Sequence, residues 1–412
     1  LMCKIGEVVV VGGVRRSALI SLSNLGDDQM RHAKSGQWWE SQPQRALANN
    51  SVNYKGRPDI GTFMREWLSL YDSKSGERGI FNRQSAKEQA GRNGRRDNDW
   101  DFGTNPCSEI ILRSKQFCNL SEVVIRATDD MKTLKEKVKF ATILGTFQST
   151  LVNFKYLTRD WKKNTEEERL LGVSLTGIMD NTLTNGKEEG LDKRLDELRK
   201  VAIATNAEWA DKIGIQQSVS ITCVKPSGTV SQLVDSASGI HARHNPYYIR
   251  TVRADKKDPL AMYMRDAGFP CEDDVMKPEH TYVFSFPMKA PENAVMRQDM
   301  SAIEQLELWL VYQKHWCEHK PSVTISVKED EWFEVGAWVY RHFDWMSGVS
   351  FLPYSEHVYK QAPYQDCDSV VYKRELDKMP KNIDWTQLSS YENTDMTEGA
   401  QELACVAGGC EI

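Results

Sequence analysis

The stretch Asn105-Pro-Cys-Ser-Glu-Ile110 places a cysteine and a carboxylate two residues apart, and Cys118 follows it. Residues two apart in an extended segment point to the same side, so Cys107 and Glu109 could act on one substrate. Pro106 stiffens the approach because its ring fixes φ and removes a donor. The pattern favours a loop that holds reactive groups in a pocket. The alternative is a buried structural cysteine beside a surface glutamate.

A second motif, Lys225-Pro-Ser-Gly-Thr-Val-Ser231, follows the strand-like segment Ser218–Val224. Backbone N–H groups at such a turn and at the helix start after it can face an anion. The hydroxylated residues and the glycine of the turn would complete a phosphate site; they are Ser227, Gly228, Thr229 and Ser231. An ordinary helix start capped by Ser or Thr is the alternative.

The end of the chain carries a third candidate. From about Tyr391 the hydrophobic periodicity is lost, and Cys405 and Cys410 have four residues between them, including a glycine pair. Such a pair can close a disulfide ring, and at a mobile terminus it suits thiol–disulfide exchange. Half of a zinc site is the rival interpretation, although no matching second pair follows.

Two further clusters are weaker. Gly12-Gly13 followed by Arg15 and Arg16 makes an anion-contacting loop, or a strand turn with two solvated arginines. His315, Cys317 and His319 could be taken for metal ligands. We expect packing or helix termination there instead, because no fourth ligand of obvious spacing follows.

Composition excludes several classes of function. The 58 acidic and 53 basic residues give a net charge of −5, which indicates neither a nucleic-acid surface nor a membrane surface. There is no apolar run of about 18 residues, and we expect no signal peptide. The nine cysteines are scattered, which favours a reducing cytoplasm over a disulfide-rich secreted domain. The first residue is Leu1, and we expect a C-terminal portion of a longer protein.

Hydrophobic patterns alternate between strand and helix and predict an α/β architecture. We expect a buried strand at Glu7–Val11, an exposed loop at Lys87–Asp99, and a helix whose first turn is Thr165–Glu168 and which runs through Gly172 to Met179. Further helices are expected near 61–71, 133–154, 191–213, 303–316 and 332–343, and strands near 282–286 and 322–327.

Together these residues resemble the large chains of ribonucleotide reductases, in particular the adenosylcobalamin-dependent (class II) ribonucleoside-triphosphate reductases. The resemblance covers nearly the whole chain. Its carriers are Gly12–Ala18, Ala46–Ser51, Gly79–Arg83, Asn105–Glu109 with Cys118, Lys225–Ser231, His315–His319, Ser350–Tyr354 and the Cys405/Cys410 tail. The step of eleven residues from Cys107 to Cys118 and the terminal cysteine pair are its most specific parts.

The resemblance implies a fold and a division of the chain. Residues 1–390 would form part of a ten-stranded α/β barrel with a central finger loop, lacking the first strands. Cys107 would lie at the tip of that loop. Residues 391–412 would be a flexible redox tail.

The resemblance also implies roles. Cys107 would become the thiyl radical that removes the 3′ hydrogen of the ribose. Glu109 would act as general base on the 3′ hydroxyl, and Asn105 would bond the ribose region. Cys118 would belong to the reducing dithiol, which Cys405 and Cys410 would regenerate. The Ser227–Ser231 loop would hold substrate phosphates, and the loop containing Arg15 and Arg16 would relay the effector's identity, with one arginine near the substrate.

The implied cofactor is adenosylcobalamin. The implied partners are a ribonucleotide, a thioredoxin- or glutaredoxin-like reductant, and a dNTP or ATP effector bound by the missing N-terminal portion. In the family, the partner of Cys118 lies upstream of the Gly-Gly-Val-Arg-Arg loop, and Cys3 is too close to that loop to replace it. We therefore expect the chain alone to lack half of the dithiol.

Two alternatives remain. A class I large subunit would take its radical from a separate metal-containing subunit through adjacent tyrosines, whereas Tyr354, Tyr359 and Tyr364 are not adjacent. A catalytically silent nucleotide-binding fragment is the other. The motifs leave open the choice between a triphosphate and a diphosphate substrate, as well as the oligomeric state.

Overall fold

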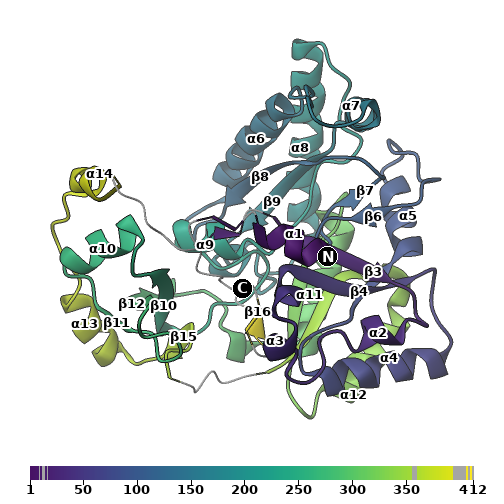
Figure 1. The fold of residues 1–412 in the computed structure, drawn as a ribbon. Coiled ribbons are helices and arrows are strands. Elements are labelled where there is room, and N and C mark those ends of the chain that lie inside the picture. The colour runs from purple at the N-terminus through teal and green to yellow at the C-terminus, as the bar shows by residue number, and fades with distance from the viewer. Residues whose placement is uncertain are drawn as a thin grey trace.

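The structure is a computed structural model (Figure 1). It describes residues 1–8, 10–11, 14–15, 17–354, 360–392, 405–406 and 409–410, with side chains for 1–6, 17–354 and 360–392. Helices and strands alternate along the chain, which confirms the predicted α/β class. Within these residues, no helix combines the length and apolar character needed to cross a membrane.

A five-stranded sheet forms one part of the centre. Three of its strands are parallel: β3 (Leu19–Ser23), β4 (Ala48–Tyr54) and β5 (Gly79–Asn82). β5 then pairs antiparallel with β14 (Ser347–Pro353), which is parallel to β13 (Val323–Val327). The sheet therefore contains two groups of strands that run in opposite directions.

Two more strands and an extended segment continue the order of strands beyond β13. β8 (Asn119–Val124) is parallel to β9 (Leu171–Thr176). Parallel bridges join Val173 of β9 to Thr222, and Val224 to Pro321, directly before β13. The predicted strand at 218–224 is thus an extended segment with bridges at two residues. The series β8, β9, 222–224, β13, β14, β5, β4, β3 agrees with a barrel wall, and its closure into a ten-stranded barrel stays a prediction.

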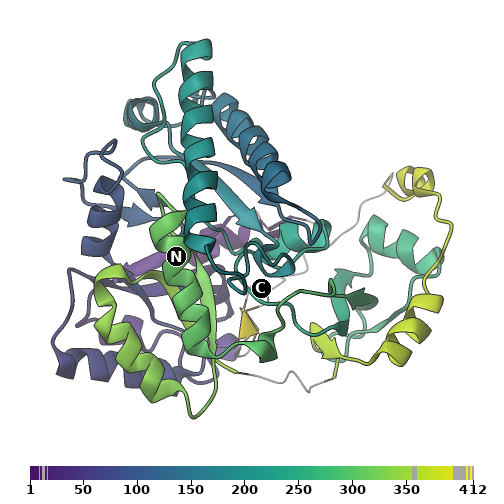
Figure 2. The same ribbon diagram turned by 180° about the vertical axis from the view of Figure 1, so that it is seen from behind.

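Helices cover the outside of this series (Figures 1 and 2). α6 (Met131–Gln148) is capped by Asp130, whose side chain forms a capping box with Thr133, and it packs on α8 (Leu191–Ile213). The other long helices are α4 (Ile60–Ser73), α5 (Arg83–Gly91), α7 (Arg159–Glu168), α11 (Ala302–His315) and α12 (Trp332–Arg341). One large apolar cluster lies between helices and strands, and the helices expected near 61–71, 191–213, 303–316 and 332–343 are confirmed.

An antiparallel sheet forms a lobe beside the series, at the left of Figure 1. Its order is β11 (Cys271–Asp273), β12 (Thr281–Lys289), β10 (Tyr247–Asp255) and β15 (Tyr364–Asp366). It lies with α10 (Pro259–Asp266), α13 (Ser369–Asp377) and α14 (Leu388–Tyr391). The division of the chain at residue 390 stays a prediction. Short elements are α1 (Met2–Val8), β1 (Val10–Val11), β2 (Val14–Arg15), α2 (Asp28–Arg31), α3 (Trp38–Ser41) and five 3₁₀ turns at Pro43–Leu47, Ile178–Asp180, Arg297–Asp299, Phe343–Trp345 and Trp385–Gln387.

Three local predictions are wrong. Glu7–Val11 is not one buried strand, because α1 runs to Val8 and the two-residue β1 pairs only with β2. Thr165–Glu168 closes α7 instead of opening a helix, and β9 follows. Lys87–Asp99 is not an exposed loop, because α5 extends through Gly91 and the Arg96 side chain is buried. In the last two cases, a pairing between Arg96 and Glu168 overrides the local pattern.

Candidate active site

Cys107 and Glu109 lie on a short loop between two paired strands. β6 (Gly103–Thr104) and β7 (Ile111–Leu112) pair antiparallel, with Thr104 opposite Ile111. This is a narrow hairpin that presents the residues between its strands at its tip. The predicted loop with a cysteine and a carboxylate is therefore present, at the turn of this hairpin.

Hydrogen bonds within the loop fix its shape. The Asn105 side-chain oxygen accepts from the Ile110 N–H at 2.9 Å, and the Thr104 hydroxyl donates to the Ile110 carbonyl at 2.9 Å. Ser108 N–H donates to the Asn105 carbonyl at 2.9 Å, and Ser108 has φ +62°. Asn105 thus shapes the turn through its oxygen, a role additional to the predicted contact with the ribose.

Three neighbouring segments hold the loop from outside. Asn49 of β4 donates to the Pro106 carbonyl at 2.7 Å, and the Lys320 N–H donates to the Glu109 carbonyl at 3.0 Å. Gly348 of β14 has φ +73°, and a Cβ there would lie 2.9 Å from the Ser108 carbonyl oxygen. The tip is therefore seated against the strand series, and glycine at 348 is what allows the close approach.

Glu109 is a buried carboxyl. It is 1% exposed, and its Oε2 has no hydrogen-bond partner among the described residues. Burial raises the pKa of Glu109 above its ordinary value, and Asn105 and Lys225 oppose this in part. A carboxyl with a raised pKa is a better general base near neutral pH than a solvated one.

Cys118 lies directly before β8 and shares the neighbourhood of Glu109. A Cβ at Gly172 of β9 would lie 3.2 Å from the Cys118 sulfur and 2.5 Å from Leu120. Burial and the charge of Glu109 raise the pKa of the Cys118 thiol, and Arg96 and Lys225 oppose this. The structure thus brings two predicted site residues, Glu109 and Cys118, into one electrostatic environment.

Sequence reasoning missed three residues of this environment. Glu122 of β8 is bonded by the Ser227 hydroxyl, and burial raises its pKa. Lys225 lowers the pKa of Glu109, Cys118 and Glu122. Cys223 is a fully buried thiol that interacts electrostatically with Glu109 and Cys118. Lys225 stood inside a recognised motif, whereas Glu122 and Cys223 gave no local signal.

The predicted phosphate loop forms a tight turn before a short helix. Ser227 has φ +58° and precedes α9 (Gly228–Leu233). The Ser227 hydroxyl donates to Glu122, and the Ser231 hydroxyl donates to the Gly228 carbonyl at 3.3 Å. A phosphate bound by Ser227 would have to displace Glu122. Phosphate binding by Ser227, Gly228, Thr229 and Ser231 therefore stays a prediction.

Several predicted residues lie outside the described side chains. Arg15 has only its backbone described, in β2, and Arg16 and the glycine pair lie outside the described residues. For the tail, only the backbone of β16 (Cys405–Val406) and β17 (Gly409–Cys410) is described, and Cys405 is opposite Cys410 in that antiparallel pair. Their roles stay predictions.

The three candidate metal ligands face different partners. His315 Nδ1 is 3.2 Å from Asp196, Cys317 is buried, and His319 contacts the backbone of β7 and β9. Over the described part of the chain, no group of three or more His, Cys, Asp or Glu side chains could hold a metal ion.

A methyl group on Gly172 is expected to disturb the thiol site. In Gly172→Ala, the new Cβ would press on Leu120 and on Cys118, so the Cys118 thiol should shift and a reaction that depends on its position should slow about tenfold or more. Steady-state assays and alkylation rates of Cys118 would measure this. Gly145→Ala on helix α6 is the matched control, because its Cβ would lie 3.5 Å from the side chains of Leu171 and Ser121, which is ordinary van der Waals contact. Equal losses in both variants would contradict the expectation.

Comparison with known proteins finds similarity to the reductases that the sequence resembles. No family model matches the chain. The chain is 28% identical, over 99% of its length, to the adenosylcobalamin-dependent ribonucleoside-triphosphate reductase of Lactobacillus leichmannii, and covers 58% of that protein. It is 27% identical over its whole length to the enzyme of the same name from Euglena gracilis, of which it covers 55%.

Solved structures agree. A B12-dependent (class II) ribonucleotide reductase superposes with a TM-score of 0.75 and 24% identity, over 95% of this chain and 57% of that one. The alpha subunit of the class Id reductase from Actinobacillus ureae gives a TM-score of 0.57 at 13% identity, over 86% of this chain and 74% of that one. These similarities confirm the resemblance inferred from the sequence, and the chain spans a little over half the length of the curated relatives.

Proposed function

We propose that this chain carries the catalytic centre of an adenosylcobalamin-dependent ribonucleotide reductase, which reduces ribonucleoside triphosphates, or diphosphates, to 2′-deoxyribonucleotides. The observation that carries the proposal is the finger loop with Cys107 at its tip, the buried Glu109 beside it, and Cys118 in the same environment. The similarity to named reductases supports it. The proposal concerns the whole protein, because the chain spans only part of those relatives.

The residues suit a radical reduction in which atoms balance. The Cys107 thiyl takes the 3′ hydrogen, and Glu109 takes the proton of the 3′ hydroxyl. The 2′ hydroxyl leaves as water with a proton from the dithiol formed by Cys118 and a second thiol. That dithiol then gives a hydrogen atom to C2′ and an electron to the 3′ carbonyl, and becomes a disulfide. The proton on Glu109 returns to the 3′ oxygen, and the 3′ hydrogen returns from Cys107. Burial of Glu109 supports this role because the raised pKa brings the carboxyl nearer to the pH of the reaction.

The partial exposure of Cys107 is compatible with a radical that a bound cofactor generates. Cys107 is partly exposed, so a cofactor can approach its sulfur, whereas Glu109 behind it is shielded from water. When bound, adenosylcobalamin supplies the organic radical that oxidises a thiol. Cys107 is the residue that would face it.

Other parts of the proposal concern the surroundings of the centre. The strand series would be part of a ten-stranded barrel. Residues 391–412 would be the redox tail, served by a thioredoxin- or glutaredoxin-like protein. A dNTP or ATP effector would act through another part of the protein, and Arg15 and Arg16 would lie on the loop that transmits its effect. The enzyme would work in the cytoplasm without nucleic acid or membrane.

Removing the tail thiols is expected to leave product formation in a single turnover unchanged and to lower steady-state turnover. Cys405→Ser with Cys410→Ser should form deoxynucleotide normally in a single turnover with a pre-reduced enzyme, because the dithiol that contains Cys118 is intact. Steady-state turnover with thioredoxin should fall about a hundredfold or more, since the tail thiols are proposed to carry electrons from the reductant to the Cys118 disulfide. Undiminished steady-state turnover would exclude the tail from electron delivery.

The proposed function is tested by assaying the complete gene product with ribonucleoside triphosphates, with and without adenosylcobalamin. Reduction that requires the cofactor supports the proposal. Reduction without cobalamin, on addition of a metal-containing radical subunit, would favour the class I alternative. No reduction under either condition would favour a silent nucleotide-binding protein.

A further inference from the structure

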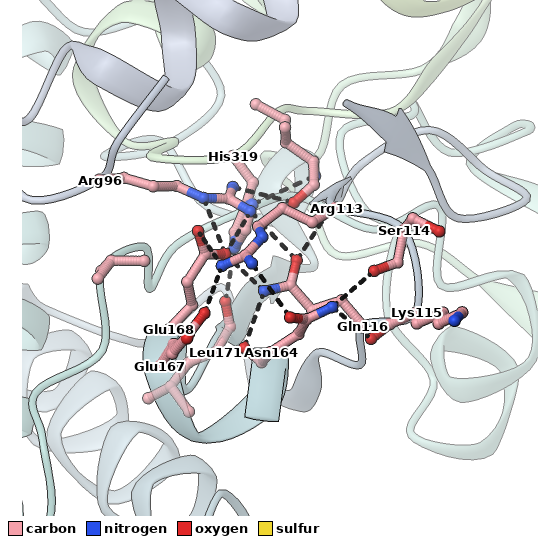
Figure 3. A network of polar contacts seen from close by, with 12 residues as sticks. Arg96, Arg113, Ser114, Lys115, Gln116, Asn164, Glu167, Glu168, Leu171 and His319 are labelled. Carbon is pink, nitrogen blue, oxygen red and sulfur yellow. Dashed lines mark hydrogen bonds and ion pairs between the residues drawn. The ribbon is translucent and has the colours of Figure 1, made fainter. Parts of the chain in front are cut away.

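The strand β7, which leaves the Cys107 loop, is paired with β6 on one edge and with side chains on the other. The Ile111 N–H donates to His319 Nδ1 at 3.3 Å, and the Ile111 carbonyl accepts from Arg96 at 3.0 Å. Backbone groups of one strand residue point to the same edge, so these two side chains take the place of a third strand. Figure 3 shows His319 and Arg96 together within a polar network.

His319 uses its second ring nitrogen on another strand. Nε2 lies 3.0 Å from the carbonyl of Leu171 in β9. A carbonyl only accepts, so Nε2 carries the hydrogen and Nδ1 accepts from Ile111. Burial, with a further contribution from the charge of Arg96, lowers the pKa of His319 to about 3. The neutral imidazole fits both contacts, whereas a protonated ring would set one N–H against another.

His319 thus bridges the Ile111 N–H and the Leu171 carbonyl. These two residues lie next to the two parts of the proposed active site, which are the Cys107–Glu109 loop and Cys118. Ile111 follows Glu109 by two residues, and the backbone N–H of the adjacent Lys320 donates to the Glu109 carbonyl at 3.0 Å. Leu171 precedes Gly172, the residue whose Cβ would lie 3.2 Å from the Cys118 sulfur. The bridge therefore connects the support of the finger loop with the support of Cys118.

Arg96 makes a parallel connection. Its guanidinium is paired with Glu168 at 2.8 Å and donates to the Gln116 side chain at 3.3 Å. Gln116 also donates to Glu168 at 2.5 Å, and it precedes Cys118 by two residues. Figure 3 shows Arg96 with Glu168 and Gln116. Because this buried ion pair is hydrogen-bonded on several sides, it holds Arg96 against the Ile111 carbonyl.

We propose that His319 is a positioning residue, which fixes the Cys107–Glu109 loop relative to Cys118 by bridging the Ile111 N–H and the Leu171 carbonyl. The inference rests on the proposed function, in which Cys107 and Cys118 act on one sugar. Misplacing a reacting group by about 1 Å can cost about a hundredfold in rate. Both hydrogen bonds of the His319 ring go to backbone groups, so its proposed role is to position the loop and not to transfer a proton.

Two substitutions test the two hydrogen bonds of His319 separately. In His319→Asn, the side-chain oxygen can occupy the place of Nδ1, which keeps the Ile111 contact and loses the Leu171 contact. In His319→Gln, the amide nitrogen can occupy the place of Nε2, which keeps Leu171 and loses Ile111. Both variants should lower kcat about tenfold to a hundredfold, with unchanged KM and an unchanged shape of the pH profile. His315→Asn is the control, because His315 contacts Asp196 outside the site.

Hydrogen exchange gives a readout that does not depend on activity. His319→Gln should speed exchange of the Ile111 amide about tenfold, while His319→Asn should leave that amide protected. Both variants should make Cys118 react faster with an alkylating reagent than it does in the wild type. If the wild type reduces no ribonucleotide, the proposed function fails and exchange still tests the bridge. Unchanged exchange and unchanged Cys118 reactivity in His319→Gln would overturn the inference.

Discussion

Replacing Cys107 with serine should abolish nucleotide reduction, by at least about four orders of magnitude in kcat. An oxygen in place of the sulfur cannot form the radical that the proposed hydrogen abstraction needs. The substitution is nearly isosteric, and Cys107 is only partly buried, so the fold should persist. Steady-state assays of deoxynucleotide formation, with a thermal unfolding curve for each protein, would measure the effect.

A second cysteine provides the matched control. Cys271 is also partly buried, but it lies on β11 in the antiparallel lobe. Cys271→Ser should retain wild-type activity. Substantial turnover by Cys107→Ser would remove Cys107 from the chemistry, and equal loss in both variants would indicate a general effect of losing a thiol.

Replacing Glu109 with glutamine should lower kcat by about two to four orders of magnitude and remove one limb of the pH profile. Burial raises the pKa of Glu109 in the folded protein. The carboxylate is the active form, so wild-type turnover should rise with pH through that raised pKa. The glutamine variant cannot titrate and should show no such rise.

Glu109→Gln should lower activity without lowering the free energy of unfolding near pH 7. Between the unfolded pKa of about 4.3 and the raised folded pKa, the native wild type binds more protons than the unfolded chain. Its free energy of unfolding therefore decreases as pH rises through that window. Glu109→Gln removes this decrease and should be at least as stable as the wild type near pH 7.

A control carboxyl separates burial from catalysis. Glu77 is also buried with a raised pKa, but it pairs with Lys34 at 2.9 Å. Glu77→Gln should lower stability, because Lys34 loses its partner, and should leave the pH profile of turnover unchanged. A wild-type-like pH profile in Glu109→Gln would exclude Glu109 as the base.

Local chemistry in the sequence was enough to predict a loop that carries Cys107 and Glu109. Asn105, Pro106 and the spacing of Cys107 and Glu109 all belong to one short segment, so the loop could be predicted without knowing any long-range contact. The alternating patterns also predicted most of the long helices, because a helix such as α8 buries one regular face, with Leu191, Leu195 and Leu198 among its buried residues.

Long-range pairings could not be predicted. Glu168 belongs to an acidic run that suits the first turn of a helix, yet it ends α7 because it pairs with Arg96, 72 residues away. The same contact buries a segment whose composition is that of a loop. The burial of Glu109, its proximity to Cys118 and the bridge through His319 likewise depend on strands that meet only in the folded chain.

Isotopic substitution at the sugar tests hydrogen abstraction most directly. The complete protein would be given ribonucleoside triphosphate carrying either hydrogen or deuterium at C3′, and a single turnover would be followed in the presence of adenosylcobalamin. If Cys107 takes the 3′ hydrogen, the deuterated substrate should react measurably more slowly, and Cys107→Ser should form no product from either substrate. Equal single-turnover rates for the two substrates, or product formed by Cys107→Ser, would contradict a thiyl radical at Cys107.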